Sequence, residues 1–135
     1  MTQPPDTPTA TGRPPRARQL VAVDDDRSLE VCLNDALQDT GWEVTYFDDV
    51  DPALEYLTTH AVDALIVDVR MPKMDGDMVL DQLADAGRLE GVTILVCSSL
   101  RPPPVIWRRF EPHGAIFLSK DHTGDRDVLL GLLPA

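Results

Sequence analysis

Short apolar runs alternate with segments of helical periodicity along the whole length of this sequence. The runs carry apolar or β-branched residues in nearly every position, as strands buried on both faces do, and they span residues 19–23, 43–47, 64–67, 93–97 and 115–118. Between them, apolar residues recur every three or four positions, which predicts helices over residues 29–37, 51–60, 77–86, 105–110 and 126–133. Repeated strand–helix units with right-handed crossovers predict an α/β fold, a doubly wound, five-stranded parallel sheet with helices on both faces.

The N-terminal segment differs in composition from the rest of the chain. Residues 1–17 contain five prolines, with threonine and glycine between them, and offer little apolar surface to bury. We therefore expect a disordered Pro-rich tail over residues 1–17 and one globular domain over residues 18–135, since a chain of 135 residues suits a single domain.

The net charge of −11 restricts the partners that this chain can bind. Three arginines and one aspartate lie in the tail segment and at its border, so the globular part is more acidic than the whole. Such a body repels the phosphate backbone, which argues against direct nucleic-acid binding. An acidic excess also suits a protein that holds a cation.

The sequence favours a reduced, cytoplasmic protein. Cys32 and Cys97 each lie among apolar residues, so we expect two small core residues rather than a disulfide. No apolar run is long enough to span a membrane, and the N-terminus lacks the apolar segment of a secretory signal.

Polar residues follow four of the five predicted strands at the point where each strand ends. They are Asp24, Asp25 and Asp26 after the first strand, Asp68 after the third, Ser98 after the fourth and Lys120 after the fifth. In open α/β sheets, ligands bind beyond the carboxyl ends of the strands. We expect these side chains to converge there, and the second strand to lie at an edge of the sheet outside the site.

Crowded carboxylates at that edge of the sheet require a cation or raised pKa values. Oxygen ligands without nearby histidine or cysteine indicate Mg²⁺, with Mn²⁺ as the alternative metal. Asp68 is then placed to attack a phosphoryl group as a nucleophile. Both reactants are anionic, so the metal, the Lys120 ammonium and the Ser98 hydroxyl would neutralise the charge on the phosphoryl oxygens.

The segment from Asp68 to Gly76, with the turn pairs Met71-Pro72 and Asp75-Gly76, carries the most specific pattern. Together with Asp24–Asp26, Ser98 and Lys120, in this order and spacing, it resembles the receiver domain of two-component response regulators, as in single-domain chemotaxis receivers. The resemblance covers about residues 18–133. It implies a flavodoxin-like fold with strand order 2-1-3-4-5, and a signalling domain whose only chemistry is its own phosphorylation and dephosphorylation.

The resemblance also implies a role for each site residue. Asp24, Asp25, Asp68 and the backbone carbonyl of Arg70 would hold Mg²⁺, and Asp68 would accept the phosphoryl group. Ser98 would move toward that group, Lys120 would pair with it, and Phe117 would be the aromatic switch residue whose ring then turns inward.

The resemblance implies partners as well. The donor would be a sensor histidine kinase or a histidine phosphotransfer protein, and the output would pass from the last two helices and the last strand to an unknown protein partner. The chain would be a monomer or a weak, phosphorylation-linked dimer.

Some positions depart from the family pattern. Asp121 follows Lys120, where most members have proline in a cis bond, so we expect a trans bond here. Leu100 cannot orient a water molecule, which predicts a slowly hydrolysed phosphoryl state. The prolines of the segment 101–104 predict a shortened fourth helix and an unusual signalling face with Trp107 on or near it.

Other functions remain open at this stage. The chain could be the receiver portion of a larger DNA-binding regulator or of a hybrid kinase. A metal-dependent aspartyl phosphatase is less well supported, because such enzymes place an acid two residues after the nucleophile, where this chain has Arg70. A pseudo-receiver that never transfers a phosphoryl group is disfavoured by the full acidic set and Lys120.

Overall fold

The structure is a computed structural model that describes residues 17–134, so the predicted tail lies outside the described residues apart from Ala17. Five parallel strands form one sheet in the order β2-β1-β3-β4-β5, as the resemblance implied. The strands are β1 (Arg18–Val23), β2 (Trp42–Phe47), β3 (Ala64–Asp68), β4 (Thr93–Ser98) and β5 (Ile116–Ser119). Each begins and ends within one or two residues of the apolar run that predicted it.

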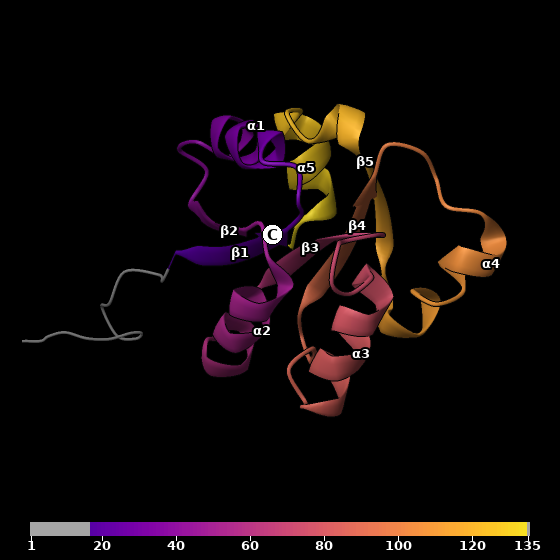
Figure 1. The fold of residues 1–135 in the computed structure, drawn as a ribbon. Coiled ribbons are helices and arrows are strands. Elements are labelled where there is room, and N and C mark those ends of the chain that lie inside the picture. Colours follow the sequence, from indigo (N-terminus) through magenta and orange to yellow (C-terminus); the bar gives the residue numbers. More distant parts are fainter. Residues whose placement is uncertain (1–16, 135) are drawn as a thin grey trace, which may run out of the picture.

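Helices cover both faces of this sheet (Figure 1). One face carries α1 (Ser28–Ala36) and α5 (Arg126–Leu132), and the other carries α2 (Val50–Thr59), α3 (Gly76–Asp85) and α4 (Pro104–Trp107). A hydrophobic core lies on each face of the sheet, and alternate residues of a strand point into opposite cores. Leu20 and Ala22 pack toward α1 and α5, whereas Val21 and Val23 pack toward α2 and α3. Burial on both faces explains why these strands read as continuous apolar runs.

The fourth helix is shorter than predicted and spans only four residues. It begins at Pro104, the last of three consecutive prolines. Beyond Ile106 the backbone tightens, since the Arg109 and Phe110 N–H groups donate to carbonyls three residues back, at 3.0 and 2.9 Å. This tightening turns the fully buried Phe110 ring into the core beside α3, so tertiary packing ends the helix early.

Both cysteines carry free thiols, as expected. Cys97 is fully buried in β4, but Cys32 on α1 is partly exposed, so its assignment to the core was wrong. Among residues 17–134, the structure contains no helix with the length and apolar character needed to cross a membrane.

Candidate functional site

Three carboxylates meet at the carboxyl edge of the sheet. Asp24 and Asp25 directly follow β1, and Asp68 ends β3, which is the hydrogen-bonded neighbour of β1 with Val23 opposite Val67. One carboxylate oxygen from each residue lies within 4.8 Å of the others. The convergence predicted from the strand ends is therefore present.

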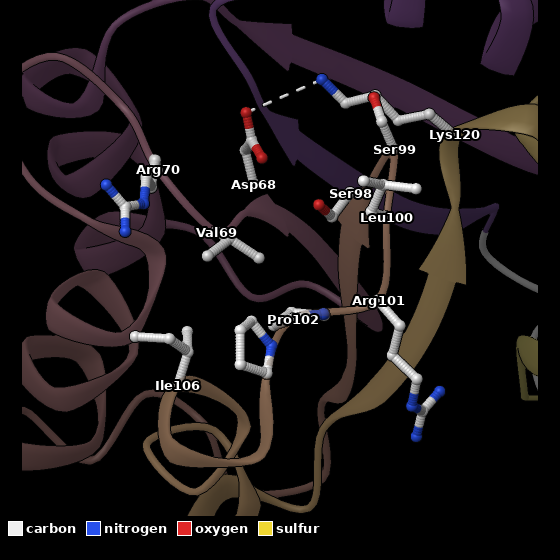
Figure 2. A pocket seen from close by; sticks show the side chains of 11 residues that line it. Asp68, Val69, Arg70, Ser98, Ser99, Leu100, Arg101, Pro102, Ile106 and Lys120 are labelled. Carbon is white, nitrogen blue, oxygen red and sulfur yellow. Dashed lines mark ion pairs between the residues drawn. The ribbon is translucent and has the colours of Figure 1, made fainter.

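Lys120, just beyond β5, reaches across this acidic group. Its Nζ lies 3.2 Å from Asp24 Oδ2 and 3.7 Å from Asp68 Oδ2, the second contact being drawn in Figure 2. Its side chain is only 23% exposed, so solvent screens these ion pairs less than it screens pairs at the surface. One ammonium thus balances at most part of the charge of three carboxylates.

Burial makes the charged state of these acids unfavourable. Desolvation and the neighbouring Asp24 charge raise the pKa of Asp68 to about 6. Desolvation also raises the pKa of Asp24, although the Asp26 N–H and Lys120 favour its ionised form. The pKa of Lys120 is raised because the Asp68 and Asp24 charges outweigh the desolvation of its ammonium. A further cation would relieve this strain on the carboxylates.

The chemistry of the donor set fits a hard divalent cation such as Mg²⁺. Asp24 is completely buried, and its Oδ1 accepts a hydrogen bond of 2.9 Å from the Asp26 N–H. Its Oδ2 accepts no hydrogen bond from any residue in the part of the chain that the structure describes, and its Lys120 contact is ionic. A buried carboxylate oxygen without a hydrogen bond, beside two further carboxylates, suits a metal or its bound water.

The loop after Asp68 is held by an unusually close backbone contact. The Gly76 N–H donates to the Val69 carbonyl at 3.0 Å, and a Cβ at Gly76 would lie 2.1 Å from the Asp68 carbonyl oxygen. Any side chain there would displace the Asp68 backbone. The sequence showed Gly76 only as a turn residue. Asp75 takes the N-cap position of α3, and Asp77 lies inside that helix.

A cavity of about 500 Å³ opens beside Asp68 and continues toward α4. Asp68, Ser98 and Lys120 share its lining with Arg70, and Figure 2 shows these side chains around one space. The structure thus brings Ser98 and Arg70 beside Asp68, and the metal-binding role of the Arg70 carbonyl stays a prediction. Leu100, also in the lining, is 80% exposed.

Comparison with known proteins identifies the family to which this arrangement belongs. The family model described as "Response regulator receiver domain" matches residues 20–130, most of the chain. The chain belongs to the response regulator receiver domain family. It is therefore a receiver domain of two-component signalling, as its motifs indicated.

Similar proteins include a response regulator, a DNA-binding transcriptional regulator and a chemotaxis protein. Response regulator MprA of Mycobacterium leprae is 37% identical over 81 residues, which are 60% of this chain and 35% of that protein. The DNA-binding transcriptional regulator NtrC of Klebsiella pneumoniae is 38% identical over 77 residues, 57% of this chain and 16% of that protein. The chain thus matches about a third or less of the length of these curated relatives. The solved structure of chemotaxis protein CheY4 of Vibrio cholerae has a TM-score of 0.74 at 26% identity, covering 86% of this chain and 98% of that one.

Two residues of this receiver domain act differently from the expectation. Asp26 is not one of the three clustered carboxylates: its Oδ1 accepts hydrogen bonds from the Ser28 N–H at 3.1 Å and the Ser28 hydroxyl at 2.7 Å, and its Oδ2 lies 4.0 Å from Lys120 Nζ. Those bonds also hold its pKa below the usual value. Tyr46 of β2 donates its hydroxyl to the Asp24 carbonyl oxygen. The second strand thus lies at the edge of the sheet and contributes none of the clustered carboxylates, as expected, although Tyr46 contacts the Asp24 backbone.

Phe117, the predicted switch residue of the receiver domain, lies partly buried in β5. The guanidinium of Arg101 lies over its ring, and the Trp107 ring meets it edge-on with 6.4 Å between centroids. Trp107 therefore lies beside the predicted signalling strand, as expected. No cis peptide bond occurs within residues 17–134, so the Lys120–Asp121 bond is trans.

Proposed function

We propose that this receiver domain accepts a phosphoryl group on Asp68, with Mg²⁺ held by Asp24, Asp25, Asp68 and the backbone carbonyl of Arg70. The observation that carries the proposal is the composition of the site. Three carboxylates lie within 4.8 Å of one another, and the Lys120 ammonium is 3.7 Å from Asp68. This arrangement is poised for an anionic group that arrives with a divalent cation.

Asp68 acts as the nucleophile in this reaction. One of its carboxylate oxygens forms a bond to phosphorus while the bond between phosphorus and the donor breaks, and the leaving group keeps that electron pair. The Lys120 ammonium pairs with the Asp68 carboxylate before the transfer and with the new phosphoryl oxygens after it. The Ser98 hydroxyl donates a hydrogen bond to one of these oxygens. Bound Mg²⁺ would supply the remaining charge neutralisation.

The signal passes from the site to the surface through Ser98 and Phe117. Movement of Ser98 toward the phosphoryl group frees the space into which the Phe117 ring turns. This rearrangement alters the face formed by α4, β5 and α5, which a protein partner reads. A sensor histidine kinase or a histidine phosphotransfer protein supplies the phosphoryl group, and dephosphorylation completes the cycle.

Incubation with acetyl phosphate and Mg²⁺, followed by intact mass measurement, tests this function. We expect one phosphoryl adduct on the wild-type protein and none on Asp68→Asn. Asp85→Asn, which removes an exposed carboxylate at the end of α3, is the matched control and should be modified like the wild type. Modification of Asp68→Asn at the wild-type rate would show that another residue is the acceptor.

A second candidate is that this domain is the receiver portion of a larger DNA-binding regulator. The name of the relative NtrC, a DNA-binding transcriptional regulator, supports it, and the chain matches only 35% and 16% of the lengths of MprA and NtrC. The reading frame of the gene decides between the two. A helix-turn-helix domain encoded in the same frame would support the regulator, and its absence would favour signalling through protein contact alone.

A further inference from the structure

The cavity beside Asp68 is larger than a phosphoryl group requires. Its volume of about 500 Å³ lies within the range of roughly 300–1,000 Å³ that is typical of small-molecule sites. One end carries Asp68, Ser98 and Lys120, and the other is formed by Val69 and the start of α4. Phosphoryl transfer fills only the first end, which leaves the second for the rest of the donor.

The far end of the cavity is apolar and lacks hydrogen-bond donors along one wall. Pro102 and Pro103 form this wall with Ile106, and neither proline has a backbone N–H. Figure 2 shows the side chains of Val69, Pro102 and Ile106 around the same space. A polar leaving group would lose water there without gaining a partner, whereas an apolar one would bury surface favourably.

The wall is held in place before any ligand binds. The N–H groups of Ile106 and Trp107 both donate to the Pro103 carbonyl at 2.9 Å. The guanidinium of Arg101 lies over the rings of Trp107 and Phe117, 5.4 and 5.1 Å from their centroids. A preformed wall reduces the entropy lost when a ligand binds, so it favours one ligand shape over others.

The cavity also carries positive charge, although the chain as a whole is acidic. Arg70 and Lys120 lie in its lining, and Lys120 is the only one of the two that contacts the carboxylates in the described part of the chain. Arg70 is thus available to an anionic ligand. The cavity combines an anion-binding end, a cationic side chain and an apolar wall.

We propose that this cavity selects phosphodonors with an aromatic or similarly flat apolar leaving group, such as an aromatic acyl phosphate. The inference rests on the proposed phosphoacceptor function of Asp68. An Asp68 oxygen bonds to phosphorus, the bond from phosphorus to the carboxylate oxygen of the donor breaks, and the aromatic carboxylate leaves with the electron pair. The leaving group would occupy the part of the cavity that Pro102 and Ile106 border.

Benzoyl phosphate and acetyl phosphate distinguish this selection from simple reactivity, because benzoate and acetate are leaving groups of similar basicity. With Mg²⁺ and intact mass as the readout, we expect the second-order rate constant for benzoyl phosphate to exceed that for acetyl phosphate by about tenfold or more. Ile106→Trp, which fills the cavity, should lower this ratio toward one. Val105→Trp, on the same helix but 61% exposed and outside the cavity, should keep the wild-type ratio.

A measurement on the wild-type protein keeps the test independent of how Ile106→Trp folds. Phenylphosphonate should slow modification by acetyl phosphate at lower concentrations than methylphosphonate does. Equal rate constants for the two donors, with Asp68 still modified, would overturn the selection and leave the phosphoacceptor function standing. Absence of modification by either donor would overturn both.

Discussion

The guanidinium carbon of Arg101 lies 5.1 Å from the centroid of the Phe117 ring. Arg101 lies in the segment that follows Ser98, the last residue of β4, and its guanidinium carbon also lies 5.4 Å from the centroid of the Trp107 ring. A cation over an aromatic ring contributes about 0.5–1 kcal/mol at an exposed site. Arg101 therefore stabilises the present position of Phe117 against the inward turn that we propose for activation.

Removal of this contact should favour the activated state. For Arg101→Ala we expect beryllofluoride with Mg²⁺ to saturate the tryptophan fluorescence change at about two- to fivefold lower concentration, as a loss of 0.5–1 kcal/mol implies. Arg108→Ala, exposed just after α4, is the control for lost charge. Equal midpoints for Arg101→Ala and the wild type would show that the contact does not oppose the turn.

The raised pKa of Asp68 predicts how stability varies with pH when metal is absent. Its pKa is about 6 in the folded protein against an ordinary value of 3.8, so the folded state binds the proton more tightly. Its contribution to stability is thus fully present below pH 3.8 and is lost as the pH rises through 6. Asp68→Asn should unfold at a higher temperature than the wild type at pH 8 in EDTA, and the difference should shrink toward pH 4. A difference that grows as the pH falls would contradict the shift.

The Tyr46 hydroxyl positions the Asp24 backbone from the edge of the sheet. Groups that orient metal ligands typically change metal affinity by about 10- to 100-fold when they are removed. Because this bond reaches the Asp24 backbone and not its carboxylate, we expect Tyr46→Phe to weaken Mg²⁺ binding by about tenfold, at the lower end of that range. Calorimetric titration measures this, with Tyr56→Phe on α2, packed against Phe47, as the matched control. If Tyr46→Phe bound Mg²⁺ as tightly as the wild type, the hydrogen bond from Tyr46 to Asp24 would have no role in metal binding.

Gly76 is the position in the loop beside the site that tolerates no side chain. Since a Cβ would lie 2.1 Å from the Asp68 carbonyl oxygen, Gly76→Ala must move α3 or β3. Overpacking of this kind costs about 1–3 kcal/mol. We expect a lower unfolding temperature and slower modification by acetyl phosphate. Gly131→Ala on α5, where a Cβ meets nothing within 4 Å, should leave both unchanged.

Leu100 lies in the lining of the site and is 80% exposed, yet it offers no group that orients a water molecule. We therefore expect the phosphorylated protein to lose its phosphoryl group slowly after removal of the donor. Leu100→Gln should shorten the lifetime, because its amide can position an attacking water. Mass measurement over time follows the decay. A lifetime of seconds in the wild type would contradict this prediction.

The strands and the residues at their ends were predictable from sequence because each depends on local pattern. An apolar run ending in aspartate places that aspartate at the carboxyl edge of a parallel sheet, and so Asp24, Asp68 and Lys120 were found. Contacts across the sheet leave no such pattern. The hydroxyl of Tyr46 meets Asp24 only because β2 pairs with β1, which places Tyr46 opposite Ala22.

Competition between local and tertiary preferences explains the other differences. The pattern of residues 105–110 suits a longer helix, but full burial of Phe110 required the chain to turn after Trp107. Asp26 looked like a fourth acid of the site, yet the free N–H of Ser28 at the start of α1 offered it a nearer partner. Neither outcome is visible without the distances that the fold sets.

The contrast between the two cysteines has a practical consequence. Burial raises the pKa of the Cys97 thiol to about 12, which leaves almost no thiolate to react with an alkylating dye. Cys32 is partly exposed on α1, on the side of the sheet away from α4. The natural sequence therefore offers one addressable attachment point, where a fluorophore can report the docking of other proteins without disturbing the acidic edge.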